Sequence, residues 1–186
     1  MPEPEAHQKE EITCLSSSLV YRNPWLSLRE DTIRRADGSK GIYGVIEKAD
    51  FVVIAAVHSG QLTLVEQYRY PVGARHWELP QGSWEQRSTD PLSLAHAELQ
   101  EETGLQAGSM IHAGHLLLAC GYSTQGYDVF LAKDLQQQDR KLDHEEQGLI
   151  ARSFAISDVE EMIRDGVIRD ASTVAAFGLL RLKGLL

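Results

Sequence analysis

Hydrophobic and polar residues alternate along much of the N-terminal part of the chain, a pattern typical of β-strands. Residues 26–34 partly alternate, Asp37–Gly38 carries a turn signal, and an extended pattern resumes at residues 41–46. Together these segments predict a β-hairpin. A continuous apolar run at residues 51–57 predicts a strand buried on both faces, and a further strand is expected at residues 61–70.

One helix is marked at both of its ends. Asp90 is a suitable N-cap, Pro91 fits the first helical position, and Gly104 stands where a left-handed glycine ends a helix. The sequence therefore predicts a helix over residues 91–103. Strands interleaved with a few helices predict an α/β (α+β) class with helices packed on a mixed sheet. Further strands are expected at residues 76–79, 110–118, 127–132 and 149–154, and helices at residues 157–165 and 171–182.

Composition and charge narrow the classes of partner. The chain has 186 residues, 42% of them hydrophobic, which is enough for one substantial core. A formal net charge of −9 argues against nucleic acid, and no apolar run is long enough for a membrane helix. Cys14 and Cys120 make neither a disulfide framework nor a zinc site, so we expect a cytoplasmic protein. The polar residues 1–16 are expected to form a disordered tail.

The predicted helix carries three glutamates where helix physics disfavours them. On a helical wheel these acids lie beside the apolar stripe, at the boundary between core and solvent. Like charges three and four residues apart near the negative end of the helix dipole cost on the order of 1–3 kcal/mol. Taken alone, such a cluster is more often a solvated face, but Mg²⁺ bound by the carboxylates would offset the cost. The acids are Glu98, Glu101 and Glu102, and the expected stripe is Leu92, Ala95 and Leu99.

Two segments together resemble the Nudix box. That box joins a glycine and a loop to a helix with the pattern R-E-U-x-E-E-x-G-U, where U is a bulky aliphatic residue. Here residues 79–82 read L-P-Q-G, and residues 97–105 read A-E-L-Q-E-E-T-G-L after a loop. The segments Q-Y-R-Y at 67–70 and W-E-L-P at 77–80 further resemble the branch that acts on ADP-ribose and other nucleotide sugars.

The resemblance covers about residues 20–182 and implies a fold and a domain organisation. The fold expected from it is a Nudix-like α/β/α sandwich with a mixed sheet, preceded by antiparallel strands. Residues 17–48 would form an N-terminal β-hairpin element used for dimerisation, and residues 49–186 the hydrolase domain. The similar proteins are usually homodimers whose N-terminal strands contribute to the partner's pocket.

The resemblance also implies roles for residues of this chain. Mg²⁺, or Mn²⁺, would be bound by Glu98 and Glu102 and by the backbone carbonyl of Gln81, with Glu101 as a further ligand or as the group that orients water. A late acidic loop supplies the general base, for which Glu145 and Glu146 both remain candidates. The candidates for contacts with the substrate, each of which could instead serve packing or solvation, are Arg69, Glu78, Trp77 and Tyr70.

The box departs from the family pattern in two places. Ala97 replaces the arginine that precedes the first helix glutamate, and the loop is about one residue longer, so the usual loop glutamate falls on Ser88 or Thr89. These departures support an alternative, a weakened Nudix domain that binds a nucleotide as a regulator. The intact set of three glutamates favours an enzyme.

The function expected from these residues is Mg²⁺-dependent hydrolysis of the diphosphate of ADP-ribose or a nucleotide sugar. The products would be a nucleoside monophosphate and a sugar phosphate. Dinucleoside polyphosphates, a GDP-sugar or a coenzyme-A-like diphosphate remain alternative substrates, because loops and a dimer interface select the sugar and the base.

Overall fold

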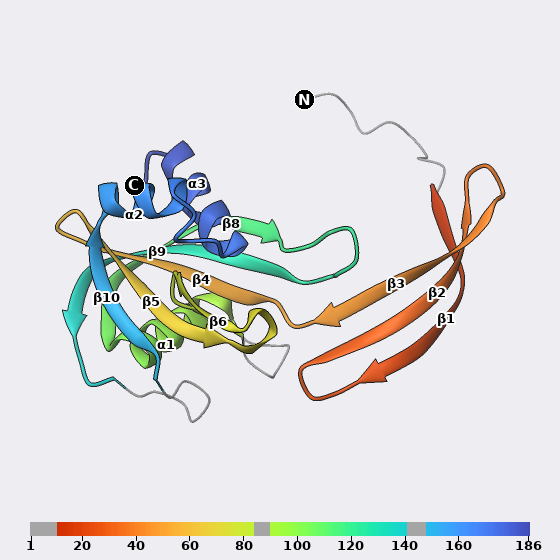
Figure 1. The fold of residues 1–186 in the computed structure, drawn as a ribbon, viewed down its shortest axis with the longest axis horizontal. Coiled ribbons are helices and arrows are strands. Elements are labelled where there is room, and N and C mark those ends of the chain that lie inside the picture. Colours follow the sequence, from red (N-terminus) through yellow and green to blue (C-terminus); the bar gives the residue numbers. More distant parts are fainter. Residues whose placement is uncertain (1–10, 84–89, 141–147) are drawn as a thin grey trace. The chain divides into compact units, whose positions relative to one another are not determined.

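The protein is described by a computed structural model that covers residues 11–83, 90–140 and 148–186. The two candidates for the general base, Glu145 and Glu146, lie outside the described residues. The chain divides into two compact units. Unit 1 comprises residues 1–49 and 119–125, and unit 2 comprises residues 50–118 and 126–186. Figure 1 shows the elements of both units along the chain.

Unit 1 is built on a three-stranded antiparallel sheet in the order β1-β2-β3. Its strands are β1 (Ile12–Arg22), β2 (Leu26–Arg35) and β3 (Lys40–Lys48). The predicted turn between the last two is confirmed, with Gly38 at φ +86°, where a side chain would be strained. Residues 119–125 join this unit through backbone hydrogen bonds of Ile46 with Tyr122 and Thr124.

The expected disordered tail is wrong at its C-terminal end. Strand β1 begins at Ile12, and Ile12, Thr13 and Cys14 pair with Arg35, Arg34 and Ile33 of β2. The short serine-rich segment carries little hydrophobic signal of its own. Its extended conformation is stabilised by backbone hydrogen bonds to a neighbouring strand, which no local pattern reveals.

Unit 2 contains a seven-stranded mixed sheet. Five strands follow the order β10-β5-β4-β9-β8, β6 pairs with β5 and β7 with β4, and the β4–β9 pair is parallel. The predicted helix over residues 91–103 is confirmed as α1, and its cap is formed by Asp90, whose side chain accepts from the Ser93 N–H. The strands are β4 (Phe51–His58), β5 (Gln61–Arg69), β6 (Ala74–Glu78), β7 (Gln81–Gly82), β8 (Leu105–Leu117), β9 (Gly126–Gln137) and β10 (Ile150–Ala155). The helices are η1 (Tyr70–Val72), α1 (Pro91–Thr103), α2 (Ile156–Arg164) and α3 (Ala171–Leu182).

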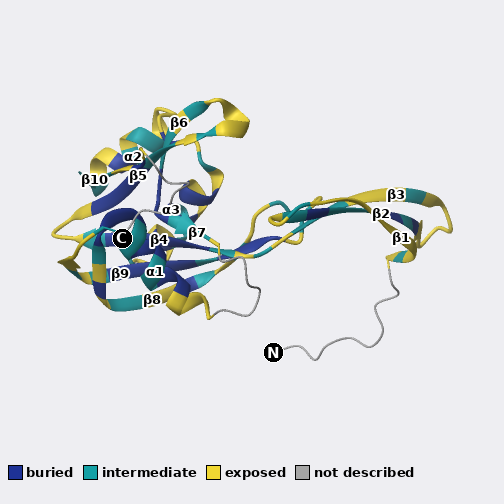
Figure 2. Cartoon of the chain, turned by 90° about the horizontal axis from the view of Figure 1, so that it is seen from below, coloured by how far each residue is buried: buried dark blue, intermediate teal, exposed yellow. Residues whose placement is uncertain are grey.

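Strand β4 shows why unit 2 is a sandwich. Val53 and Ala55 pack into one cluster with residues of α2 and α3, whereas Val52 and Ile54 pack into another with residues of α1. Successive side chains of a strand point to opposite faces, so helices cover both faces of the sheet. The expected α/β/α sandwich and the strand buried on both faces are thus confirmed, and the central strands are dark blue in Figure 2. No helix among the described residues is long and apolar enough to span a membrane.

Candidate active site

The glutamates of α1 lie deeper than the helical wheel indicates. Glu102 is 1% exposed and Glu98 is 8% exposed, so both belong to the buried arc of the helix together with Leu99. Glu101 lies at the edge of this arc with intermediate exposure. The expected apolar stripe is wrong at its N-terminal end, because Leu92 in the first turn is 42% exposed. Leu94 fills that part of the core instead.

The segment Gln81–Gly82 of β7 lies directly against these carboxylates. The backbone N–H of Gln81 donates to Glu102 Oε2 at 3.0 Å. A Cβ added to Gly82 would lie 2.3 Å from the carboxylate carbon of Glu98, so only glycine leaves room for that side chain. The two halves of the box, separated by a loop in the sequence, therefore meet at one place in the fold.

This arrangement fits a hard divalent cation. Glu98 and Glu102 are one helical turn apart and both lie at the backbone of Gln81 and Gly82, so the site is rich in oxygen ligands. Within the described ranges, no group of three or more His, Cys, Asp or Glu side chains is arranged to hold a metal ion. Mg²⁺ does not require one, because it commonly uses one or two carboxylates together with waters and phosphates of a substrate.

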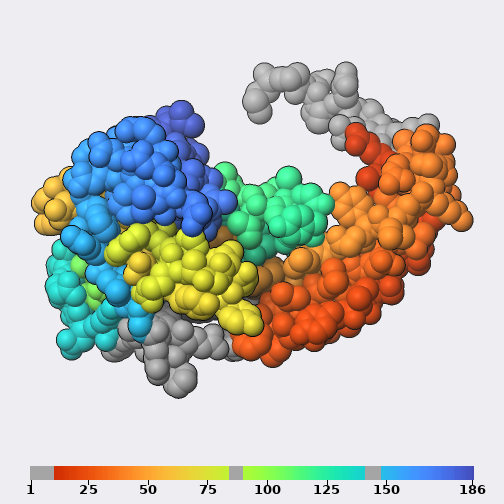
Figure 3. All heavy atoms as spheres, viewed as in Figure 1, coloured from red at the N-terminus to blue at the C-terminus, as the bar shows by residue number. Residues whose placement is uncertain are grey.

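A pocket of about 560 Å³ lies in unit 2 where β5, η1 and β6 meet the segment that leads into α3. Figure 3 shows these two parts of the surface side by side, in yellow and blue. The volume is typical of a small-molecule site. The residues that line the pocket are Arg69, Pro71, Val72, Ala74, His76, Glu78, Arg169, Asp170 and Ala171.

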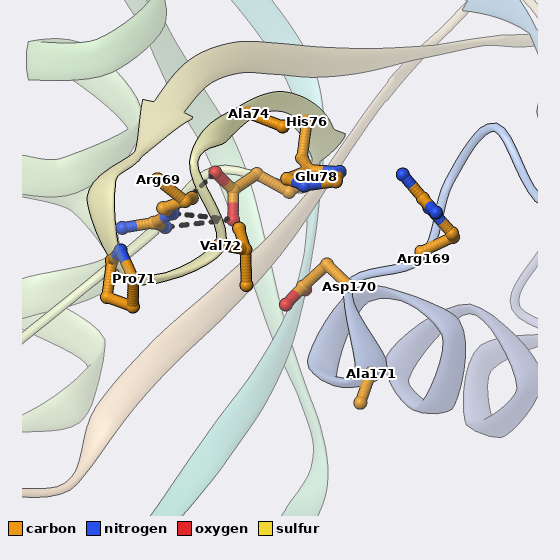
Figure 4. A pocket seen from close by; sticks show the side chains of 9 residues that line it. All are labelled: Arg69, Pro71, Val72, Ala74, His76, Glu78, Arg169, Asp170 and Ala171. Carbon is orange, nitrogen blue, oxygen red and sulfur yellow. Dashed lines mark hydrogen bonds and ion pairs between the residues drawn. The ribbon is translucent and has the colours of Figure 1, made fainter.

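Arg69 and Glu78 form a bidentate ion pair on one wall of this pocket (Figure 4). Arg69 Nε donates to Glu78 Oε1 at 3.0 Å, and Nη2 donates to Oε2 at 2.8 Å. Burial raises the pKa of Glu78 above its ordinary value, and the hydrogen bonds from Arg69 oppose that rise without cancelling it. Burial lowers the pKa of Arg69, but the hydrogen bonds and ion pair with Glu78 outweigh it, so this pKa is raised. Burial prevails over the ion pair at Glu78 but not at Arg69, because the Glu78 side chain is far more buried than that of Arg69.

The two aromatic candidates are placed differently from the two charged ones. Tyr70 lies in η1 next to the pocket and is 85% exposed, but it does not line the pocket. Trp77 packs edge-on against Phe154 with ring centroids 5.0 Å apart, beside the core. Stacking of either ring on a base stays a prediction.

Among the pocket residues that the sequence did not indicate, three have polar or charged side chains. Arg169 and Asp170 lie across the pocket from Arg69 (Figure 4), and His76 extends from β6. Asp170 could have been recognised as a helix N-cap, because its carboxylate accepts from the Thr173 N–H at 2.8 Å. No sequence signal brings it next to β5 and β6, since that proximity arises only when α3 packs on the sheet.

Several known proteins are similar in sequence to this chain. Residues 12–46 match a family model described as the nucleoside diphosphate sugar hydrolase N-terminal domain. An ADP-ribose pyrophosphatase of Mycobacterium tuberculosis is 31% identical over 163 residues, which span 87% of this chain and 79% of that protein. An ADP-ribose pyrophosphatase of Bacillus subtilis is 29% identical over 172 residues, spanning 91% of this chain and 92% of the other.

A solved structure extends the likeness to the fold. The crystal structure of an ADP compounds hydrolase superposes with a TM-score of 0.83 at 18% sequence identity. The match covers 97% of this chain and 100% of the other. At this identity the superposition shows that the fold is shared.

Proposed function

Because the chain belongs to the ADP-ribose and nucleoside diphosphate sugar pyrophosphatase branch of the Nudix hydrolase superfamily, we propose that it hydrolyses the diphosphate of ADP-ribose or a nucleotide sugar with Mg²⁺ or Mn²⁺. The products are a nucleoside monophosphate and a sugar phosphate. Dinucleoside polyphosphates and GDP-sugars are the alternative substrates of the same chemistry.

One observation carries this proposal. The buried carboxylates of Glu98 and Glu102 lie against the backbone of Gln81 and Gly82, and the side chain of Gln81 donates to Glu78 in the pocket wall. An oxygen-rich metal site is thereby joined to a pocket of nucleotide-compatible size. A substrate in the pocket would bring its diphosphate toward α1, where negative charge needs a cation.

Different side chains have different proposed roles in hydrolysis. Bound Mg²⁺ would neutralise the diphosphate and lower the pKa of a coordinated water. Glu98 and Glu102 would hold the metal together with the backbone carbonyl of Gln81, and Glu101 would supply a further ligand or orient the water. Glu145 or Glu146 takes the proton from the attacking water as general base.

The pocket offers two arginines for the phosphates. Arg69 is held by Glu78 through Nε and Nη2, which leaves Nη1 for a ligand. Arg169 forms no hydrogen bond or ion pair within the part of the chain that the structure describes, and it faces the same pocket. Arg169 is therefore the better placed of the two to bind a phosphate, while Glu78 and Asp170 supply acceptors for sugar hydroxyl groups.

The test is release of phosphate after coupling to a phosphatase, with ADP-ribose and a panel of nucleotide sugars, in Mg²⁺ and in EDTA. We expect metal-dependent turnover of at least one compound. Glu102→Gln keeps the shape of the side chain and removes its charge. We expect it to lower kcat by about a hundredfold or more, since loss of metal-based charge stabilisation costs several kcal/mol. Wild-type turnover by this variant would refute the metal assignment.

The regulator alternative rests on Ala97 and the altered box loop. It predicts that nucleotides and Mg²⁺ raise the melting temperature while no compound of the panel is hydrolysed. The burial of both Glu98 and Glu102 at the Gln81–Gly82 backbone favours the enzyme, because a binding module has no need of such a pair.

We also propose that the protein is a homodimer formed through the sheet of unit 1. Several large apolar side chains of this sheet are exposed, which is uncommon on a monomer unless the surface binds a partner. The most exposed of them are Leu19, Val20, Tyr21 and Ile42, and Trp25 lies between β1 and β2.

A further inference from the structure

Gln81 connects the pocket to the glutamates of α1 through two separate parts of its structure. Its backbone N–H donates to Glu102 Oε2 at 3.0 Å. Its side-chain amide donates to Glu78 Oε2 and accepts from the Ser172 hydroxyl at 2.8 Å. Gln81 is not among the residues that line the pocket, and its amide bonds to Glu78, which does line it.

We propose that the side-chain amide of Gln81 is a positioning group that keeps the metal-binding backbone of β7 in register with the substrate pocket. This inference rests on the proposed function and goes beyond it, because it assigns a role to a side chain that touches neither metal nor substrate. A distance error of about 1 Å between reacting groups can cost on the order of a hundredfold in rate.

The hydrogen bonds allow the amide only one orientation. The carboxylate of Glu78, paired with Arg69, accepts hydrogen bonds, so the Gln81 NH₂ must face it and the Gln81 carbonyl must face Ser172. Ser172 is buried near the start of α3, and its hydroxyl lies within hydrogen-bond distance of both the Gln81 carbonyl and Asp170 Oδ2. Because this hydroxyl has a single hydrogen, it donates to only one of these oxygens at a time. The orientation of the amide is therefore set by Glu78, since reversal would place two acceptors against each other there.

The network joins β6, β7, α1 and α3. Glu78 ends β6, Ser172 lies in the first turn of α3, and Glu102 lies in the last turn of α1. A second bond links the same elements, since the Leu79 N–H donates to Thr173 Oγ1 at 2.9 Å. That bond fixes α3 to the β6–β7 connection whatever residue stands at position 81. The backbone of Gln81 is paired with β4, and the Gln81 amide adds a side-chain contact that ties this backbone to the pocket wall.

Gln81→Met tests the proposal, because methionine keeps the unbranched shape and the backbone N–H but has no amide. We expect kcat with the best substrate of the panel to fall about tenfold to a hundredfold, as for residues that orient metal ligands. KM should stay within about threefold, because no group that contacts the nucleotide is removed. The Kd for Mg²⁺, measured by isothermal titration calorimetry without substrate, should rise about tenfold, as should the Mg²⁺ concentration for half-maximal activity.

Ser172→Ala shows whether the amide acts through α3. Alone it should lower kcat less than Gln81→Met, because Gln81 retains its bond to Glu78. In the double variant the fall should equal that of Gln81→Met within about twofold, since residues of one hydrogen-bond network are not additive. Effects that multiply would overturn the proposed route.

Thr63→Val is the matched control for loss of a partly buried side-chain hydrogen bond. The Thr63 hydroxyl bonds to Ser153 at 3.0 Å between β5 and β10, and neither residue lines the pocket. This variant should lower the melting temperature while kcat, KM and the Mg²⁺ requirement stay unchanged. An equal fall in kcat for Thr63→Val would assign the Gln81 effect to general destabilisation and overturn the inference.

Failure of the proposed function and failure of the proposed role of Gln81 give different experimental results. A wild-type protein that hydrolyses no compound of the panel removes the proposed function and this inference together. A wild-type protein that is active, with Gln81→Met equal to it in kcat and Mg²⁺ requirement, removes only the inference.

Discussion

Each of the two units departs from the usual distribution of side chains, and the most prominent departure differs between them. Unit 2 buries the carboxylates of Glu78, Glu98 and Glu102, while the sheet of unit 1 leaves Leu19 56% and Ile42 67% exposed. Burial of charge is costly without partners, and exposure of large apolar groups loses their hydrophobic stabilisation. The buried carboxylates lie at the proposed metal site and in the pocket wall, and the exposed apolar side chains lie on the proposed dimer surface.

The two units also differ in how their folds are stabilised. In unit 2 the two apolar clusters on the faces of the sheet hold the site together. The three strands of unit 1 bury side chains of β2 alone, at Ser27, Asp31 and Ile33. A short sheet with so small a core is marginal by itself, so a partner surface would contribute much of its stability.

Gly82→Ala is the change with the largest expected effect, because it breaks the buried site directly. The added methyl group would lie 2.3 Å from the Glu98 carboxylate, which would have to move. We expect kcat to fall by about a hundredfold or more and stability to fall by roughly 1–3 kcal/mol. Steady-state kinetics and chemical denaturation measure the two effects.

Gly178→Ala is the control for that substitution. Gly178 lies inside α3, and a Cβ there would meet no atom within 4 Å. Alanine should raise stability by about 0.5–1 kcal/mol and leave kcat unchanged. Equal kinetic constants for Gly82→Ala and Gly178→Ala would contradict the close contact between β7 and Glu98.

Leu19→Asp and Ile42→Asp test the exposed apolar surface of unit 1. Leu19 pairs with Arg29 and Ile42 pairs with Thr32, so the two side chains lie on opposite faces of the sheet. The substitution on the face that a second chain covers should raise the dimer dissociation constant about tenfold or more. The other substitution should change it little.

Sedimentation equilibrium across a range of protein concentrations measures both constants. Because both side chains are exposed in a single chain, neither substitution should alter the fold of unit 2. A wild-type protein that remains monomeric at every concentration would disprove the dimer and leave the exposed side chains unexplained.

Glu78→Gln has the smallest expected effect, a change in how stability depends on pH. The pKa of Glu78 is raised in the folded state. The contribution of this carboxyl group to the free energy of unfolding is therefore full below its ordinary pKa of 4.5 and is lost as pH rises through the folded pKa. The free energy of unfolding of wild type minus that of Glu78→Gln should therefore decrease as pH rises from about 4. Urea titrations at a series of pH values measure this difference.

Asp90→Asn should show the opposite slope. The hydrogen bonds from Ser93 lower the pKa of the Asp90 carboxyl below its ordinary value, so its contribution is present above that value and is lost as pH falls. Parallel slopes for the two variants would show that burial is not the main cause of the shift in the pKa of Glu78.

Local signals in the sequence determined much of this protein. The caps at Asp90 and Gly104 predicted both ends of α1, and the apolar run at residues 51–57 predicted a strand covered on both faces. Each of these signals acts within a few residues, through backbone hydrogen bonds or side-chain period. The spacing of the three glutamates and the L-P-Q-G segment likewise predicted one site, because the box requires its parts to coincide.

Other features were decided only by the tertiary structure. The depth of Glu98 and Glu102, the exposure of Leu92 and the pairing of Ile12–Cys14 with β2 depend on which neighbour covers each residue. The meeting of Arg169 and Asp170 with Arg69 and Glu78 in one pocket, and the bond between the Gln81 amide and Ser172, join residues about 90 to 100 positions apart. Such contacts form only when α3 packs on the sheet, so no pattern within one segment of the chain can contain them.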